Sequence, residues 1–166
     1  MTPPPPSVWT SYVYAPQECD IHSVAGTLKL YLRDLPESIF TTHIYQEMFK
    51  VYQSGGPDTA QAYLALFSKI PQSPNQACIV FLIEHMVRVS QHERQNKMSP
   101  HNLATVFGPT MLHGQDGLSG KRAGASKDSN QLATGTVDVM AQAGILLFFI
   151  SRRARGEPIQ IVERQV

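Results

Sequence analysis

The sequence predicts an all-α protein, and three observations support this fold class. Apolar residues recur at spacings of three and four in several segments, which is the period of a helix with one buried face. Residues that favour helix starts and residues that favour helix ends divide the chain at matching intervals. No segment of useful length alternates apolar and polar residues as a half-buried strand does.

Length and charge limit the classes of protein to consider. The chain has 166 residues, enough for one domain with a core but with little room for a second. Its formal net charge of +1 provides no overall field that would attract nucleic acid or an anionic membrane. Electrostatic recognition must therefore be local, and we expect no nucleic-acid partner.

The compartment is inferred from the cysteines and from the start of the chain. Cys19 and Cys78 have neither a disulfide-framework pattern nor a metal-binding spacing, so we interpret them as reduced, partly buried thiols. The opening MTPPPPSVW lacks the basic end and apolar core of a signal peptide. The longest apolar stretch, VDVMAQAGILLFFI, is too short to span a bilayer. We expect a cytoplasmic protein without direct membrane insertion, and recruitment to membranes through partners stays open.

Four consecutive prolines, Pro3 to Pro6, define the first segment of the chain. Such a run favours an extended polyproline conformation and cannot start a core. We interpret residues 1–18 as a disordered leader. An SH3 or WW domain as partner for Pro3–Pro6 is the alternative, although no flanking specificity residue stands out.

Three helices are expected in the first part of the folded region. Asp20 is a suitable N-cap for the first helix, and Pro36 ends it. The second covers roughly 42–53 and ends at a glycine pair, after which Pro57 opens the third. The stripe of the first helix consists of Ile21, Val24, Ala25, Leu28, Leu32 and Leu35.

Two further helices are expected between residues 70 and 112. Ser73 to Gln76 reads as a capping box that opens a long helix ending near Glu93. Ser99 caps a shorter helix, which Gly108-Pro109 should end. The buried side of the long helix is predicted to carry Cys78, Phe81, Leu82, His85, Met86 and Val89.

The last part of the chain begins with a segment rich in Gly, Ser and Lys. This segment, residues 113–135, has no periodicity, so we interpret it as a flexible insertion loop. A final helix is expected at about 136–152, followed by a C-terminal tail at 153–166.

Motifs for catalysis, metals and cofactors are not recognisable. The six histidines are scattered without metal-ligand spacing, and neither a nucleophile motif nor a phosphate-binding loop occurs. We therefore expect no metal, no cofactor and no catalytic residue of the chain's own, which favours a regulator over an enzyme.

The first predicted helix carries a candidate docking surface. Lys29 and Arg33 are four residues apart and project from the same side, and Gly26 lies one turn before Lys29. A glycine inside a helix costs roughly 1 kcal/mol relative to alanine. Two cations beside a bare patch of helix would suit an acidic or phosphate-bearing partner. Alternatively, both cations are merely solvated and Gly26 eases packing between helices.

Two blocks of sequence carry a resemblance to a known family. AGTLKLYLRDLPES at residues 25–38 resembles the L-K-x-x-L-R-x-L-P-E-P-L element of Rho GTPase-activating (RhoGAP) domains. NKMSPHNLATVFGPTML at residues 96–112 resembles their N-K-M-x-x-x-N-L-A-x-V-F-G-P element. The resemblance runs from about Asp20 to Phe149 and is strongest to the Bcr-like members of the family.

This resemblance implies a RhoGAP-like helical bundle and a partner. The partner would be a Rho-family small GTPase in its GTP form, with a Rac-like GTPase favoured. Lys29, Arg33 and Asn102 match the family residues that contact the switch regions of the GTPase, and Asn102 would lie close to the catalytic centre. The residues expected to support this surface are Gly26, Ser99, Gly108 and Pro109.

The chain departs from the family pattern in two places. Ser38-Ile39 stands where the family has Pro-Leu, a change of turn that should cost little binding. The family also carries an upstream segment resembling G-I-x-R-x-S-G, whose arginine enters the GTPase active site. Here the first arginine is Arg33, and no lysine precedes Lys29. We therefore expect residues 19–152 to form a partial RhoGAP domain that lacks its N-terminal helices and its arginine finger.

Three functions remain compatible with the sequence. The first is a Rho-family GTPase activator whose catalysis is impaired in this form. The second is a non-catalytic module that binds or scaffolds a GTP-loaded GTPase. The third is a helical interaction protein without a GTPase partner, which the two matched blocks disfavour.

Overall fold

The computed structural model describes residues 20–113 and 129–159, and every regular element in these ranges is helical. The all-α prediction is thus confirmed. The elements are α1 (Ile21–Arg33), α2 (Thr42–Ser54), α3 (Thr59–Ser68), η2 (Gln72–Gln76, a π-helical turn), α4 (Ala77–Ser90), α5 (Glu93–Asn96), α6 (Pro100–Met111) and α7 (Ser129–Ala154).

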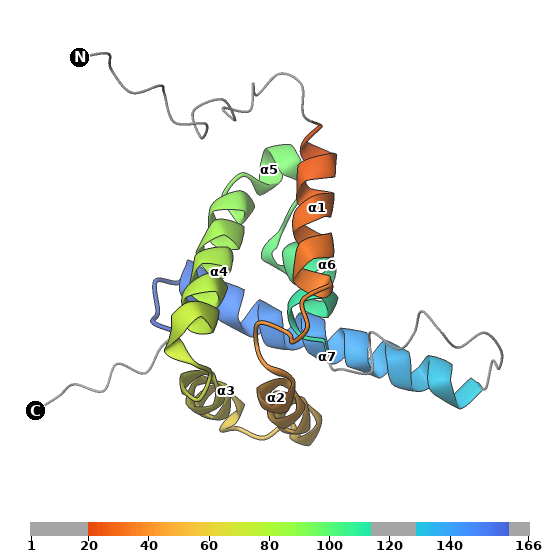
Figure 1. Cartoon of the computed structure of the whole chain (residues 1–166). Helices are drawn as coiled ribbons and strands as arrows, with labels where there is room; N and C mark the ends of the chain where they lie inside the picture. The colour runs from red at the N-terminus through yellow and green to blue at the C-terminus, as the bar shows by residue number, and fades with distance from the viewer. Residues whose placement is uncertain (1–19, 114–128, 160–166) are drawn as a thin grey trace, which may run out of the picture.

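Helix α7 crosses the molecule and organises the rest of the bundle. Helices α2, α4 and α6 all pack against it, with α2 and α3 on one side and α4 and α6 on the other (Figure 1). Phe149 of α7 lies in the centre, with ring centroids 5.3 Å from Phe67 and 5.8 Å from Phe40. All three rings are fully buried, and such tilted aromatic pairs add to the stabilisation from area burial. The core therefore gathers around the C-terminal half of α7.

The predicted helix starts and ends are largely confirmed. A carboxylate oxygen of Asp20 accepts a hydrogen bond from the backbone N–H of His22 (3.2 Å), and the Ser99 hydroxyl accepts one from the N–H of Asn102 (3.1 Å). Gly55 ends α2 in the left-handed conformation, with φ 59°. These caps satisfy backbone groups that have no partner inside the helix.

The capping box predicted at Ser73 to Gln76 stays a prediction, because the side chain of Ser73 lies outside the described residues. The structure gives Gln76 another role. Its buried amide donates to the carbonyls of Phe67 (3.1 Å) and Ile70 (2.8 Å), where α3 ends. A buried amide must find acceptors, and the unpaired carbonyls at a helix end provide them.

The buried side of α4 was predicted only in part. Leu82 and Met86 are buried as expected, whereas Cys78 and His85 are exposed and the exposed fraction of Phe81 is 64%. Ile79 and Ile83 are fully buried in their place. Almost every position of this helix is apolar or neutral, so the periodicity alone does not decide which face turns inward.

The prediction that Gly108-Pro109 ends the helix is also wrong, because α6 continues to Met111. Pro109 removes one backbone donor, yet the helix closes beyond it through the N–H of Leu112, which donates to the Gly108 carbonyl (2.9 Å). Gly108 has another role. A Cβ atom at this position would lie 2.9 Å from backbone atoms of Gln142 and Ala143 in α7.

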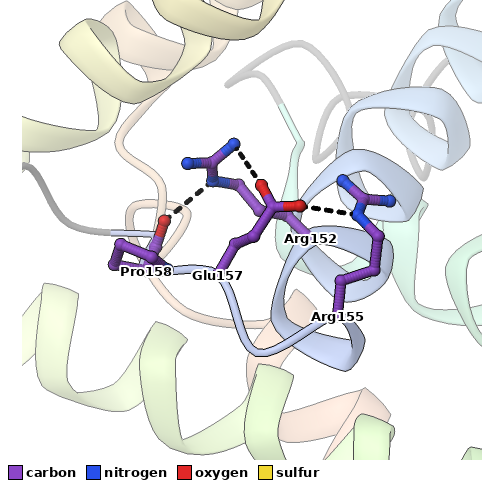
Figure 2. A network of polar contacts seen from close by, with 4 residues as sticks. All are labelled: Arg152, Arg155, Glu157 and Pro158. Carbon is purple, nitrogen blue, oxygen red and sulfur yellow. Dashed lines mark hydrogen bonds and ion pairs between the residues drawn. The ribbon is translucent and has the colours of Figure 1, made fainter.

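The end of the chain differs from expectation at both sides of α7. The helix begins at Ser129, within the segment expected to be a loop, and residues 114–128 lie outside the described residues. Beyond α7, the Arg152 guanidinium donates to the Pro158 carbonyl (2.8 Å), and Glu157 lies 2.7 Å from both Arg152 and Arg155 (Figure 2). Ile159 is buried, so the first residues after α7 fold back onto the bundle.

None of the helices in the two described ranges combines the length and the apolar character needed to cross a bilayer.

We predict opposite effects of two glycine substitutions on stability. Gly108→Ala should lower the free energy of unfolding by about 1–3 kcal/mol, because its methyl group would overlap the α7 backbone. Gly26→Ala serves as the control, since no atom lies within 4 Å of the added Cβ, and should raise it by about 0.5–1 kcal/mol. Urea unfolding of both variants measures these changes. Equal effects of the two substitutions would contradict the α6–α7 contact.

We also predict a loss of stability at alkaline pH that depends on Tyr63. Burial raises the pKa of this hydroxyl to about 12, and nearby Tyr52 adds to the shift. The unfolded chain ionises near pH 10 and the folded protein does not, so the stabilisation is present below pH 10 and is lost between pH 10 and 12. Urea unfolding at pH 8 and pH 11.5 should show wild type losing up to about 2 kcal/mol more than Tyr63→Phe. Equal losses would contradict the shift.

Candidate functional site

An open hollow of about 460 Å³ lies between α1 and α6. Its walls combine basic, apolar and hydroxyl side chains. They are Gly26, Lys29, Leu30 and Arg33 of α1 with Val106 and Thr110 of α6.

The two cations predicted to form a docking surface lie together in this hollow. Lys29 and Arg33 follow one another by one helical turn on the same side of α1. The Nε atom of Arg33 is 3.4 Å from a carboxylate oxygen of Asp34, and both side chains are about half exposed. Such an exposed pair is weak, so Arg33 remains available to a partner. Among the described residues, no ion pair involves Lys29.

Gly26 leaves a bare stretch of helix in the wall of the hollow. A Cβ atom added to it would meet nothing within 4 Å, in contrast to Gly108. Gly26 therefore does not serve close packing among the described residues, which was the alternative explanation for its presence. Its effect is to expose backbone next to Lys29.

Asn102 lies outside the lining of the hollow, on the same side of α6. It precedes Val106 and Thr110 by one and two helical turns. Its side-chain amide donates to the carbonyl of Lys97 (2.9 Å), a residue with φ 60° that ends α5. This bond and the Ser99 cap fix the first turn of α6 from two sides. The structure thus brings Lys29 and Arg33 together and places Asn102 farther along the same surface.

The other supporting residues act through α6. Ser99 caps its start, Gly108 allows it to approach α7, and Pro109 is accommodated inside the helix rather than after it. Ser99 and Gly108 therefore help to fix where the α6 wall of the hollow stands.

Sequence reasoning missed three residues of the hollow, Leu30, Val106 and Thr110. The exposed fractions of Leu30 and Val106 are 48% and 41%, and both side chains line the hollow. Counting in steps of four from Asn102 would have found Val106 and Thr110. Leu30 lies beside the predicted apolar stripe of its helix, and no sequence signal singles it out.

The surface offers groups that bind rather than groups that react. Two cations suit carboxylates or phosphates, and the two exposed aliphatic side chains suit an apolar side chain of a partner. Among residues 20–113 and 129–159, no three His, Cys, Asp or Glu side chains gather in a way that could hold a metal ion.

Comparison with known proteins is consistent across sequence and structure. The model of the RhoGAP domain family matches residues 8–116. This match begins inside the segment interpreted as a leader, whose residues lie outside the described ranges. The breakpoint cluster region protein of Rattus norvegicus is 37% identical over 142 residues, which cover 85% of this chain and 11% of that protein. The active breakpoint cluster region-related protein of Xenopus tropicalis is 36% identical over 133 residues, covering 80% and 15%.

Solved structures show the same fold. The BH domain of GRAF, the GTPase regulator associated with focal adhesion kinase, superposes with a TM-score of 0.64 at 22% identity, covering 84% of this chain and 67% of that one. Human Rho GTPase activating protein 15 superposes with a TM-score of 0.62 at 25% identity, covering 82% and 58%. The chain spans only a small part of the curated relatives, between 11% and 15% of their length. Since the family model covers more than half of its residues, the chain belongs to the RhoGAP domain family.

Proposed function

We propose that the surface formed by the hollow and Asn102 binds a Rho-family small GTPase in its GTP form and that the chain acts as a regulator of GTP hydrolysis. The observation that carries the proposal is the pairing of two available cations with two exposed aliphatic side chains on one concave surface. Membership of the RhoGAP domain family identifies the kind of partner. The resemblance to Bcr-like proteins favours a Rac-like GTPase.

In the proposed complex, the basic and the apolar residues of the surface would contact different groups of the GTPase. Lys29 and Arg33 would attract acidic groups of the GTPase switch regions, and the planar guanidinium of Arg33 suits bidentate contact with a carboxylate. Leu30 and Val106 would receive an apolar side chain between them. Asn102, at the start of α6, would reach farthest toward the bound nucleotide.

Rate acceleration is a separate matter from docking. An activator stabilises charge on the transferred phosphoryl group with an arginine supplied in trans, which contributes roughly 10³–10⁵ in rate for Ras. In these 166 residues the first arginine is Arg33, and it belongs to the proposed docking surface. We therefore propose that the chain binds the GTPase and accelerates hydrolysis only weakly. If the acceleration is absent altogether, the chain is a non-catalytic binding or scaffolding module, which is the second candidate function.

Binding should depend on both cations. Lys29→Ala and Arg33→Ala should each weaken binding to Rac loaded with a non-hydrolysable GTP analogue by about tenfold, because each removes a charge-assisted contact. Titration calorimetry at fixed ionic strength measures the change. Lys50→Ala is the matched control, since Lys50 is an exposed lysine of α2 that pairs with Glu47 and does not line the hollow. A double variant Lys29→Ala/Asn102→Ala that binds as tightly as wild type would refute the proposed surface.

The chain should bind the GTPase but accelerate GTP hydrolysis only weakly. In single-turnover assays at saturating concentration, this chain should accelerate GTP hydrolysis by Rac less than tenfold. The reason is that no arginine precedes α1 in the 166 residues and that Arg33, the first one, belongs to the proposed docking surface. Rho- and Cdc-type GTPases tested in parallel determine the preference. Acceleration of about a hundredfold or more would show that another group supplies the missing charge.

A further inference from the structure

Two hydrogen bonds join the ends of the helices that form the hollow. Ser38 lies in the connection between α1 and α2, has an exposed fraction of 1%, and donates its hydroxyl to the carbonyl of Met111 at 2.5 Å. His113 is also buried, and its Nε2 atom lies 3.4 Å from the carbonyl of Leu32. The two contacts run in opposite directions, from the α1–α2 connection to the last residue of α6 and from the residue two positions after α6 to the last turn of α1.

Both acceptors are backbone carbonyls that find no N–H donor within their own helix. Met111 is the last residue of α6, and the final carbonyls of a helix have no partner within it. The residue four positions after Leu32 is Pro36, which has no N–H to donate. Because a carbonyl can only accept, the Nε2 atom of His113 carries the proton in this contact. Ser38 and His113 therefore satisfy buried groups that would otherwise be costly.

The bonds also lie next to the walls of the hollow. Met111 directly follows Thr110, and Leu32 directly precedes Arg33. A shift at either bond would therefore move a wall residue on the opposite helix. No other side-chain hydrogen bond among those of the described residues connects the end of α1 with the end of α6.

We propose that Ser38 is a positioning residue, which holds the end of α1 against the end of α6 and so sets the spacing between Arg33 and the α6 wall of the hollow. The RhoGAP element that this segment resembles has proline at this position, and proline has no hydroxyl to donate. The serine was expected to be a turn change of little consequence for binding; the buried hydrogen bond assigns it a larger part. The consequence for binding rests on the proposed GTPase docking, whereas the positioning itself does not.

The first experiment measures the positioning without a partner. Nitroxide labels on Tyr31→Cys in α1 and Thr105→Cys in α6, both exposed, report the spacing of the helices in a chain with Cys19→Ser and Cys78→Ser. Ser38→Ala should broaden the distance distribution between the labels. Tyr45→Phe is the matched control, because it also removes a hydroxyl donor between two elements, here from α2 to Asp138 of α7. An unchanged distribution in Ser38→Ala would overturn the proposal.

The second experiment measures binding to Rac loaded with a non-hydrolysable GTP analogue. Ser38→Ala should weaken binding five- to tenfold at a temperature where it remains folded, and Tyr45→Phe less than twofold. In a double-mutant cycle, Ser38→Ala and Arg33→Ala should couple by at least threefold, because the serine acts through the arginine. Additive effects would assign Ser38 a purely structural role and overturn the proposal.

His113→Phe provides a second variant if Ser38→Ala fails to fold, since it breaks the other bond between the same helix ends and should also broaden the distribution. The two experiments separate the two proposals. A broadened distance distribution together with no binding by wild type would support the positioning and refute the proposed docking.

Discussion

The approach of α6 to α7 at Gly108 is the contact on which the rest of the structure depends. The backbones come so close that a single methyl group would overlap Gln142 and Ala143. Helix α7 carries the centre of the core, and α6 carries one wall of the hollow. The position of α6 against the core therefore sets the position of this wall of the hollow. Ser99 at one end of α6 and Ser38 at the other then fix the helix along its length.

A nearly neutral chain can still place two cations side by side on one surface. The net charge of +1 gives little attraction at long range, so the proposed docking relies on these local charges. The four-residue spacing of Lys29 and Arg33 provides this, and the bare backbone at Gly26 gives a partner room to approach them. The aliphatic side chains opposite add contact area that depends little on salt. The proposed docking would thus combine local charge with burial of apolar groups.

The sequence predicted the fold class and most helix ends because local chemistry decides them. Asp20, Ser99 and Gly55 act within one turn of the backbone, and their roles follow from their side chains alone. The buried face of α4 was predicted only in part, because an almost uniformly apolar helix is oriented by its neighbours. Pro109 illustrates the same limit: its local tendency to end a helix is overridden by the packing of α6 on α7.

The site was predictable to a similar extent. Lys29 and Arg33 could be paired from their spacing, because both lie on one helix. The sequence did not assign Leu30, Val106 and Thr110 to the same surface. The reason is that α1 and α6 lie far apart along the chain and come together only in the folded structure. The hydrogen bond of Ser38 was likewise not predictable, because its acceptor, the Met111 carbonyl, lies 73 residues away in the sequence.

The placement of the hollow outside the core has a consequence for how this domain can change over evolution. Apart from Thr110, its lining residues are exposed or half buried, and they are absent from the buried cluster around Phe149. Under the proposed function, replacing one of them would alter what the surface recognises while leaving the scaffold folded. Gly108 has no such freedom, since every other residue would force two helices apart. If this surface docks the partner as proposed, partner preference can diverge through single substitutions on a bundle that stays constant.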